Sequence, residues 1–141
     1  MNERTNCPFC KRIAAGEYDY EDTWSVAFQP LLPVTPGHFL VVPRKHVAHA
    51  LESPGSAGKA LEFAGYLANQ MGLEAANFIT SAGLAATQSV FHLHVHVVPR
   101  HADDGLVLPW THQRDELLKL PGAVSGELLK LPGAVSPEVP S

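Results

Sequence analysis

Three histidines alternate with apolar residues between Phe91 and Val98. This period-two pattern predicts a half-buried β-strand, on which His92, His94 and His96 project to the same face. Imidazole titrates near neutral pH, so a row of three favours a chemical role. The residues alone leave three interpretations open: a catalytic Zn²⁺ site, a histidine nucleophile with supporting phosphate-binding groups, and a polar strand face that binds nothing.

Cys7 and Cys10 are the two cysteines of the chain and stand at Cys-x-x-Cys spacing. In a protein expected to be cytosolic, stabilising disulfides are rare. Such a pair therefore indicates either metal ligands or a redox pair. A redox motif of this kind normally follows a strand within a βαβ unit, and no strand fits before Cys7. Metal binding is therefore the favoured interpretation, and it requires two further ligands.

The remaining periodicity predicts the elements that position these residues. Ser53 is a typical N-cap for a long helix that begins at Pro54 and ends at Met71, and residues 10–15 form a short helix. Strands are predicted at residues 24–28, 38–42, 77–80 and 89–98. Several strands around one substantial helix predict an α+β domain with an antiparallel sheet.

Composition limits the classes of function. The 141 residues, 45% of them hydrophobic, suit one globular domain, and the net charge of −4 argues against binding to nucleic acid. No apolar run approaches the roughly 18 residues of a membrane-spanning helix, and the first seven residues lack a signal-peptide core, so we expect no membrane association and a cytoplasmic location.

The C-terminal part differs from the rest in sequence. Residues 116–125 recur without change as residues 127–136. Two copies interrupted by Pro-Gly are too few and too short for a repeat fold. We therefore predict a domain over residues 1–112 and a tail over residues 113–141 without a catalytic role.

The segment from Gln88 to Arg100 resembles the signature of the histidine triad (HIT) family of nucleotide hydrolases and transferases, particularly its small bacterial Hint-like branch. Three further segments agree in order and spacing, namely residues 7–11, 26–28 and 36–46. The resemblance implies a HIT-like fold, with a mostly antiparallel five-stranded sheet, one long helix and a short N-terminal helix. It also implies a homodimer that acts on a small purine nucleotide.

The resemblance assigns a role to each residue of the histidine row. It implies that His94 attacks the α-phosphorus of a nucleotidyl phosphoramidate or dinucleoside polyphosphate and forms a nucleotidyl-histidine intermediate that water cleaves. His96 would donate to the phosphate oxygens, while Gln88 and Ser89 would hold the phosphate and the leaving group. His38 would lie near the nucleophile and help to fix its orientation.

The same resemblance completes the metal site. In zinc-containing bacterial members the ligands fall at the positions of Cys7, Cys10, His46 and His92. A closed Cys₂His₂ set is typical of structural Zn²⁺ and would leave His94 and His96 for chemistry. His49, one helical turn beyond His46, is a substitute candidate.

By position, the pocket for the base would contain Phe9, Phe28 and Leu31, although residues of these types are more often part of the core. Trp110 resembles a tryptophan that reaches the partner's active site in the Hint-like branch, although packing on its own core is an equal alternative.

Three positions depart from the pattern of the family. Pro30 stands where many members have an acidic residue for the ribose, Ser81 stands where many have an asparagine in the nucleotide site, and Thr87 replaces the usual glycine before Gln88. Ribose recognition and the preferred leaving group are therefore open.

Two rival functions remain beside the nucleotide hydrolase. The triad itself could hold Zn²⁺ for metal-assisted hydrolysis, in which case Cys7→Ser would leave the zinc bound. Alternatively, the chain is a nucleotide-binding or protein-interaction module with only residual hydrolysis, which the changes at Pro30 and Ser81 favour. A nucleotidyl transferase is less consistent with the sequence, because those relatives typically have proline where this chain has Leu93.

Overall fold

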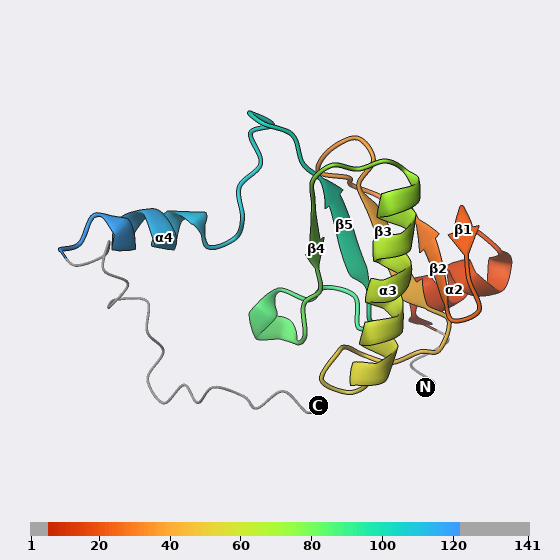
Figure 1. Ribbon diagram of the computed structural model, residues 1–141. Coiled ribbons are helices and arrows are strands. Elements are labelled where there is room, and N and C mark those ends of the chain that lie inside the picture. The colour runs from red at the N-terminus through yellow and green to blue at the C-terminus, as the bar shows by residue number, and fades with distance from the viewer. Residues whose placement is uncertain (1–5, 122–141) are drawn as a thin grey trace, which may run out of the picture. The chain divides into compact units, whose positions relative to one another are not determined.

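The computed structural model describes residues 6–121 (Figure 1). The chain divides into two units, the first ending at Ala102 and the second beginning at Asp103. The first unit contains a five-stranded sheet in the order β1-β2-β3-β5-β4, in which every neighbouring pair is antiparallel. The predicted α+β class and antiparallel sheet are confirmed.

Three of the strands agree closely with the predicted segments, whereas β1 was not predicted and the histidine strand is shorter than predicted. Their bounds are β1 Tyr20–Glu21, β2 Ser25–Phe28, β3 Phe39–Pro43, β4 Ala76–Ile79 and β5 Val95–Pro99. The histidine strand was predicted from residue 89 but begins only at Val95. Its first half leaves the sheet because the Leu93 N–H donates to the carbonyl of Val47, in the loop after β3, at 2.8 Å.

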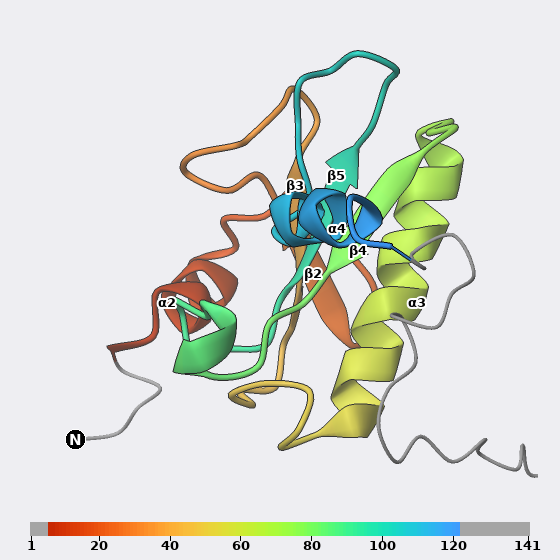
Figure 2. The ribbon, with the colours of Figure 1, turned by 90° about the vertical axis from the view of Figure 1, so that its left-hand side faces the viewer.

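Two helices lie on opposite sides of the strands (Figure 2). The long helix α3, Pro54–Gln70, begins at the predicted N-cap, where the Ser53 hydroxyl accepts from the Ser56 N–H. The short helix α2, Pro8–Ala15, begins after Cys7 and ends at Gly16, which has the left-handed φ of +70° that favours glycine.

The two helices cover two separate apolar cores, because alternate strand residues face opposite sides of the sheet. Ala27, Val41 and Val97 pack under α3, whereas Val26 and Leu40 pack with Phe9 on the side of α2. Leu40 is paired with His96 in the β3–β5 register, which puts His96 on the α2 side as well.

The second unit contains α4, Thr111–Leu118. Trp110 directly precedes this helix and is 52% exposed, so it is not packed in a core. The predicted domain boundary after residue 112 remains a prediction, and the second copy of the duplicated segment lies outside the described residues. Within residues 6–121, no helix is long and apolar enough to cross a membrane.

Candidate functional site

Four potential metal ligands converge at the N-terminus of α2. The ligand atoms of Cys7, Cys10, His46 and His92 all lie within 4.8 Å of one another. Cys7 is the N-cap of α2 and its sulfur accepts from the Cys10 N–H at 3.3 Å. The sequence-predicted set is thus brought together from three segments that are far apart in the chain.

The donor set fits a small tetrahedral metal ion. The His92 Nε2–H donates to the Pro43 carbonyl at 2.7 Å, so His92 Nδ1 carries a lone pair. That atom lies 3.1 Å from His46 Nδ1 and 3.3 Å from Cys7 Sγ. Tetrahedral Zn²⁺ at normal bond lengths would put such pairs about 3.4 and 3.6 Å apart. Burial also lowers the pKa of His92 to about 4, which keeps the imidazole neutral as a ligand must be.

His94 lies beside this cluster and is held by its own backbone. Its Nδ1–H donates to the His92 carbonyl at 2.7 Å, and its ring meets the edge of Phe9 at a centroid distance of 5.2 Å. The Thr80 hydroxyl donates to the His94 carbonyl at 2.7 Å, which fixes the backbone. Burial lowers the pKa of His94, against the effect of the His92 carbonyl. The Nε2 atom of a neutral His94 therefore carries the lone pair that a nucleophile needs.

His38 and His96 form a hydrogen-bonded pair whose tautomers follow from their partners. The Val34 N–H donates to His38 Nδ1 at 3.1 Å, so the proton of a neutral His38 is on Nε2. His38 Nε2 lies 3.0 Å from His96 Nδ1, which must then accept, leaving an N–H donor at His96 Nε2. Burial lowers the pKa of both rings, that of His96 to about 4. Since the centre of the His96 ring lies 5.1 Å from that of the His94 ring, this donor is next to His94.

The predicted phosphate-binding residues divide into a positioning residue and an exposed one. Both donors of the Gln88 amide are taken, by the carbonyls of Ala48 at 2.7 Å and Val90 at 3.0 Å. Its oxygen accepts from the Gly83 N–H at 2.8 Å. Gln88 is 3% exposed, so its amide is not accessible to a ligand in this structure. Its three hydrogen bonds instead stabilise the loop before the histidines. Ser89, by contrast, is exposed and lines an open pocket of about 600 Å³ with Cys7 and His46.

The three candidates for the base pocket differ in burial and do not lie together in one element. Phe9 and Phe28 are buried, with ring centroids 5.4 Å apart, and belong to the core on the α2 side. Leu31 is 91% exposed in the loop between β2 and β3, so the expectation that it could belong to the core is wrong. Ser81 is partly buried in the segment that follows β4.

Several groups that position the site were not predicted from the sequence. They are the Val34 N–H, the carbonyls of Pro43 and Ala48, and the hydroxyl of Thr80. Three of the four are main-chain groups. Residues carry such groups whatever their side chain, so the sequence does not indicate which of them bond to the site. Thr80 ends a predicted strand and has a hydroxyl, but nothing in its spacing relates it to His94.

Comparison with known proteins agrees with this geometry. A family model described as the HIT domain matches residues 16–103, so the chain belongs to the histidine triad family. It is 34% identical over 119 residues to adenosine 5′-monophosphoramidase HNT1 of Saccharomyces cerevisiae, covering 81% of this chain and 75% of that one.

Two solved structures show the same fold. A HIT family hydrolase from Clostridium thermocellum has a TM-score of 0.62 and 31% identity, over 73% of this chain and 97% of that chain. A zinc-bound histidine triad family protein from Mycobacterium smegmatis has a TM-score of 0.60 and 29% identity, over 74% of this chain and 82% of that chain.

Proposed function

We propose that this protein is a nucleotide hydrolase that uses His94 as a covalent nucleophile on the α-phosphate. The observation that carries the proposal is the hydrogen bond from His94 Nδ1 to the His92 carbonyl, which directs the Nε2 lone pair away from the backbone. The phosphoramidase activity in the name of the yeast relative supports a nucleotide with a phosphorus–nitrogen bond as substrate. Dinucleoside polyphosphates, which present the same α-phosphorus, are the second substrate class.

The reaction has two displacements. In the first, His94 Nε2 forms a bond to phosphorus while the bond to the amine or phosphate leaving group breaks, and an amine leaving group takes up a proton from solvent. In the second, water attacks phosphorus and releases a proton to solvent, the bond from phosphorus to Nε2 breaks, His94 leaves as neutral imidazole, and a nucleoside monophosphate is released. The His96 Nε2–H, held in place through His38, would donate to the phosphate oxygens as negative charge develops on them.

In the proposal, Cys7, Cys10, His46 and His92 hold a structural Zn²⁺. The ion would supply a tetrahedral cross-link between α2, the loop after β3 and the segment before β5. These four residues do not include His94 or His96. Among residues 6–121, no other group of three or more histidine, cysteine or acidic side chains is placed to hold a metal ion. This favours the cross-linking role over metal held by the triad.

The test is turnover of adenosine phosphoramidate and diadenosine tetraphosphate, followed by mass spectrometry, for the wild type and His94→Ala. We expect hydrolysis by the wild type, its loss in His94→Ala, and a transient mass increase of one nucleotidyl group on the wild-type chain. His112→Ala, which changes an exposed histidine of α4, is the matched control and should keep full activity.

Undiminished turnover by folded His94→Ala would refute the nucleophile. Absence of turnover by the zinc-loaded wild type would instead favour the nucleotide-binding module. If chelation abolished activity while Cys7→Ser kept its zinc, metal-assisted hydrolysis at the triad would replace the proposal.

A further inference from the structure

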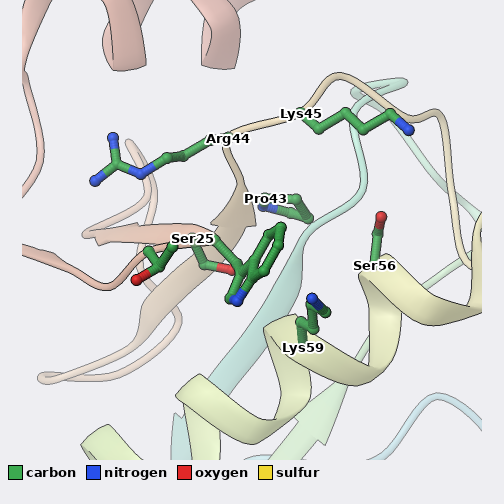
Figure 3. A pocket seen from close by; sticks show the side chains of 8 residues that line it. Ser25, Pro43, Arg44, Lys45, Ser56 and Lys59 are labelled. Atoms are coloured by element: carbon green, nitrogen blue, oxygen red, sulfur yellow. The ribbon is translucent and has the colours of Figure 1, made fainter.

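A second pocket lies away from the histidines, on the α3 side of the sheet. It has a volume of about 280 Å³ and is formed where the start of β2 and the end of β3 meet the first turns of α3 (Figure 3). Its eight lining residues are Thr23, Trp24, Ser25, Pro43, Arg44, Lys45, Ser56 and Lys59. Three of them are basic and none is acidic, so the pocket favours an anion.

The basic residues are not equivalent. Arg44 is engaged by the carboxylate of Glu21 at 2.6 Å, and in Figure 3 it points to the opposite side from Lys45 and Ser56. The Lys59 ammonium lies 3.1 Å from the centre of the Trp24 ring, and this cation–π contact holds it at the wall of the pocket. Lys45 is exposed at the rim. Lys45 and Lys59 therefore supply the charge available to a ligand.

An unpaired buried hydroxyl provides an independent sign of a ligand. Ser25 is fully buried, and its Oγ is the one buried side-chain polar atom without a hydrogen-bond partner among residues 6–121. Ser25 alternates with Val26 and shares the face of Ala27, which packs under α3, so its side chain is directed to the side of the sheet where the pocket lies. A buried hydroxyl without a partner is costly, and a ligand oxygen would satisfy it.

The helix adds one side-chain donor to the same pocket. Ser56 lies in the first turn of α3, where the helix dipole favours negative charge, and its own N–H is bonded to the Ser53 hydroxyl. Its side chain accepts from the Ser53 hydroxyl at 2.8 Å, so its own hydroxyl hydrogen remains to be donated.

We propose that this pocket binds a phosphate group, held by Lys45, Lys59 and Ser56 and completed by the Ser25 hydroxyl. The site is separate from the histidine site and does not depend on the function proposed above. Because Ser25 is fully buried in the lining, the phosphate would reach its hydroxyl after neighbouring lining side chains move aside. The group could belong to orthophosphate or to a phosphate ester, and the experiment separates the two.

The test is an NMR titration of ¹⁵N-labelled full-length protein with orthophosphate, at ionic strength kept constant with sodium chloride. We expect saturable shifts of the Trp24 indole and of the Ser25 and Ser56 amides. Lys45→Gln/Lys59→Gln should weaken this binding at least tenfold, whereas Lys11→Gln, which removes an exposed charge from α2, should not change it. Adenosine monophosphate shifting the same signals would identify a phosphate ester as the ligand class, and orthophosphate alone doing so would identify the free anion.

Ser25→Ala tests the hydroxyl by a different measurement. Without phosphate this variant should melt at or above the wild-type temperature, because it removes an unpaired polar group. At saturating phosphate the melting temperature of the wild type should rise more than that of the variant, so that the wild type becomes the more stable of the two. Linear shifts without saturation, equal shifts in the double variant, or shifts confined to His94 and His96 would overturn the proposal.

Discussion

Thr87 has a backbone conformation that is unfavourable for a residue with its side chain. It has a φ of +67°, in the left-handed region that is unfavourable for β-branched residues. The usual glycine of the family at this position would adopt that conformation freely, so the departure in sequence is also a strained position in structure.

We expect Thr87→Gly to raise the free energy of unfolding by about 1 kcal/mol, measured by urea denaturation. Ala85→Gly, in the neighbouring 3₁₀ turn, should lower it slightly. An unchanged or lower stability of Thr87→Gly would show that the Thr87 hydroxyl, which donates to the Ala86 carbonyl, outweighs the strain.

Substitution of Gln88 tests whether this residue positions the loop or binds phosphate. Gln88→Ala would leave the Gly83 N–H and the carbonyls of Ala48 and Val90 without their partner, so we expect a loss of about 2–4 kcal/mol of stability. Gln70→Ala, on the exposed end of α3, should stay within about 0.5 kcal/mol. A Gln88→Ala variant of normal stability with a raised KM would instead support phosphate binding.

The half-buried imidazole of His96 makes stability depend on pH. Its pKa is lowered to about 4 by burial, so between that value and about 6.5 the unfolded chain binds more protons than the folded one. Stability contributed by neutral His96 is therefore complete above about pH 6.5 and falls as the pH decreases toward 4.

His96→Asn should flatten this dependence. Allowing for partial solvent exposure, we expect the wild type to lose about 1 kcal/mol more than the variant between pH 7 and pH 5 in urea denaturation. Parallel losses in the two proteins would mean that His96 takes up its proton over the same pH range in the folded and the unfolded chain.

At the scale of elements, α2 contacts the rest of the first unit through the four proposed metal ligands as well as through Phe9. If Zn²⁺ is bound, we expect about one ion per chain by elemental analysis, and chelation should lower the melting temperature by about 5 °C or more. His46→Asn should lose the metal, whereas His49→Asn should keep it, since His49 is not in the cluster. Equal zinc content in both variants would require a different ligand set.

The sequence predicted the elements whose signals are local. The N-cap and proline of α3 and the buried strand β3 were placed within one or two residues, because capping and periodicity are properties of neighbouring positions. The failure at residues 89–94 has a tertiary cause, since those residues keep the alternating pattern of a strand while bonding to the loop after β3. The two exposed residues of β1 gave no periodic signal.

The candidate site was predicted to a similar extent. The four clustered ligands and the proximity of His94 to His96 follow from side-chain identity and from the family pattern. What could not be predicted was which atoms pair, because hydrogen bonds to main-chain groups such as those of Val34 and Pro43 depend on the tertiary arrangement alone.

At the scale of the whole molecule, β4 is an edge strand that pairs with β5 on one side, and no strand among residues 6–121 pairs with its other side. Phe78 on this strand is 40% exposed. We expect two chains to associate, as the resemblance implied, and sedimentation should give twice the 15.2 kDa of one chain. Phe78→Glu should produce monomers, and Tyr66→Glu, on the exposed side of α3, should not. A monomeric wild type would refute this expectation.

His92 serves two parts of the molecule through different atoms. Its ring contacts the other proposed metal ligands, whereas its main-chain carbonyl accepts from His94 Nδ1–H and so fixes the tautomer of His94. A carbonyl is common to all twenty amino acids, so mutation of the ring removes a ligand without removing the acceptor. A lineage that lost the proposed metal through mutation of this ring would therefore keep the acceptor that orients His94, and with it the reaction proposed for that residue.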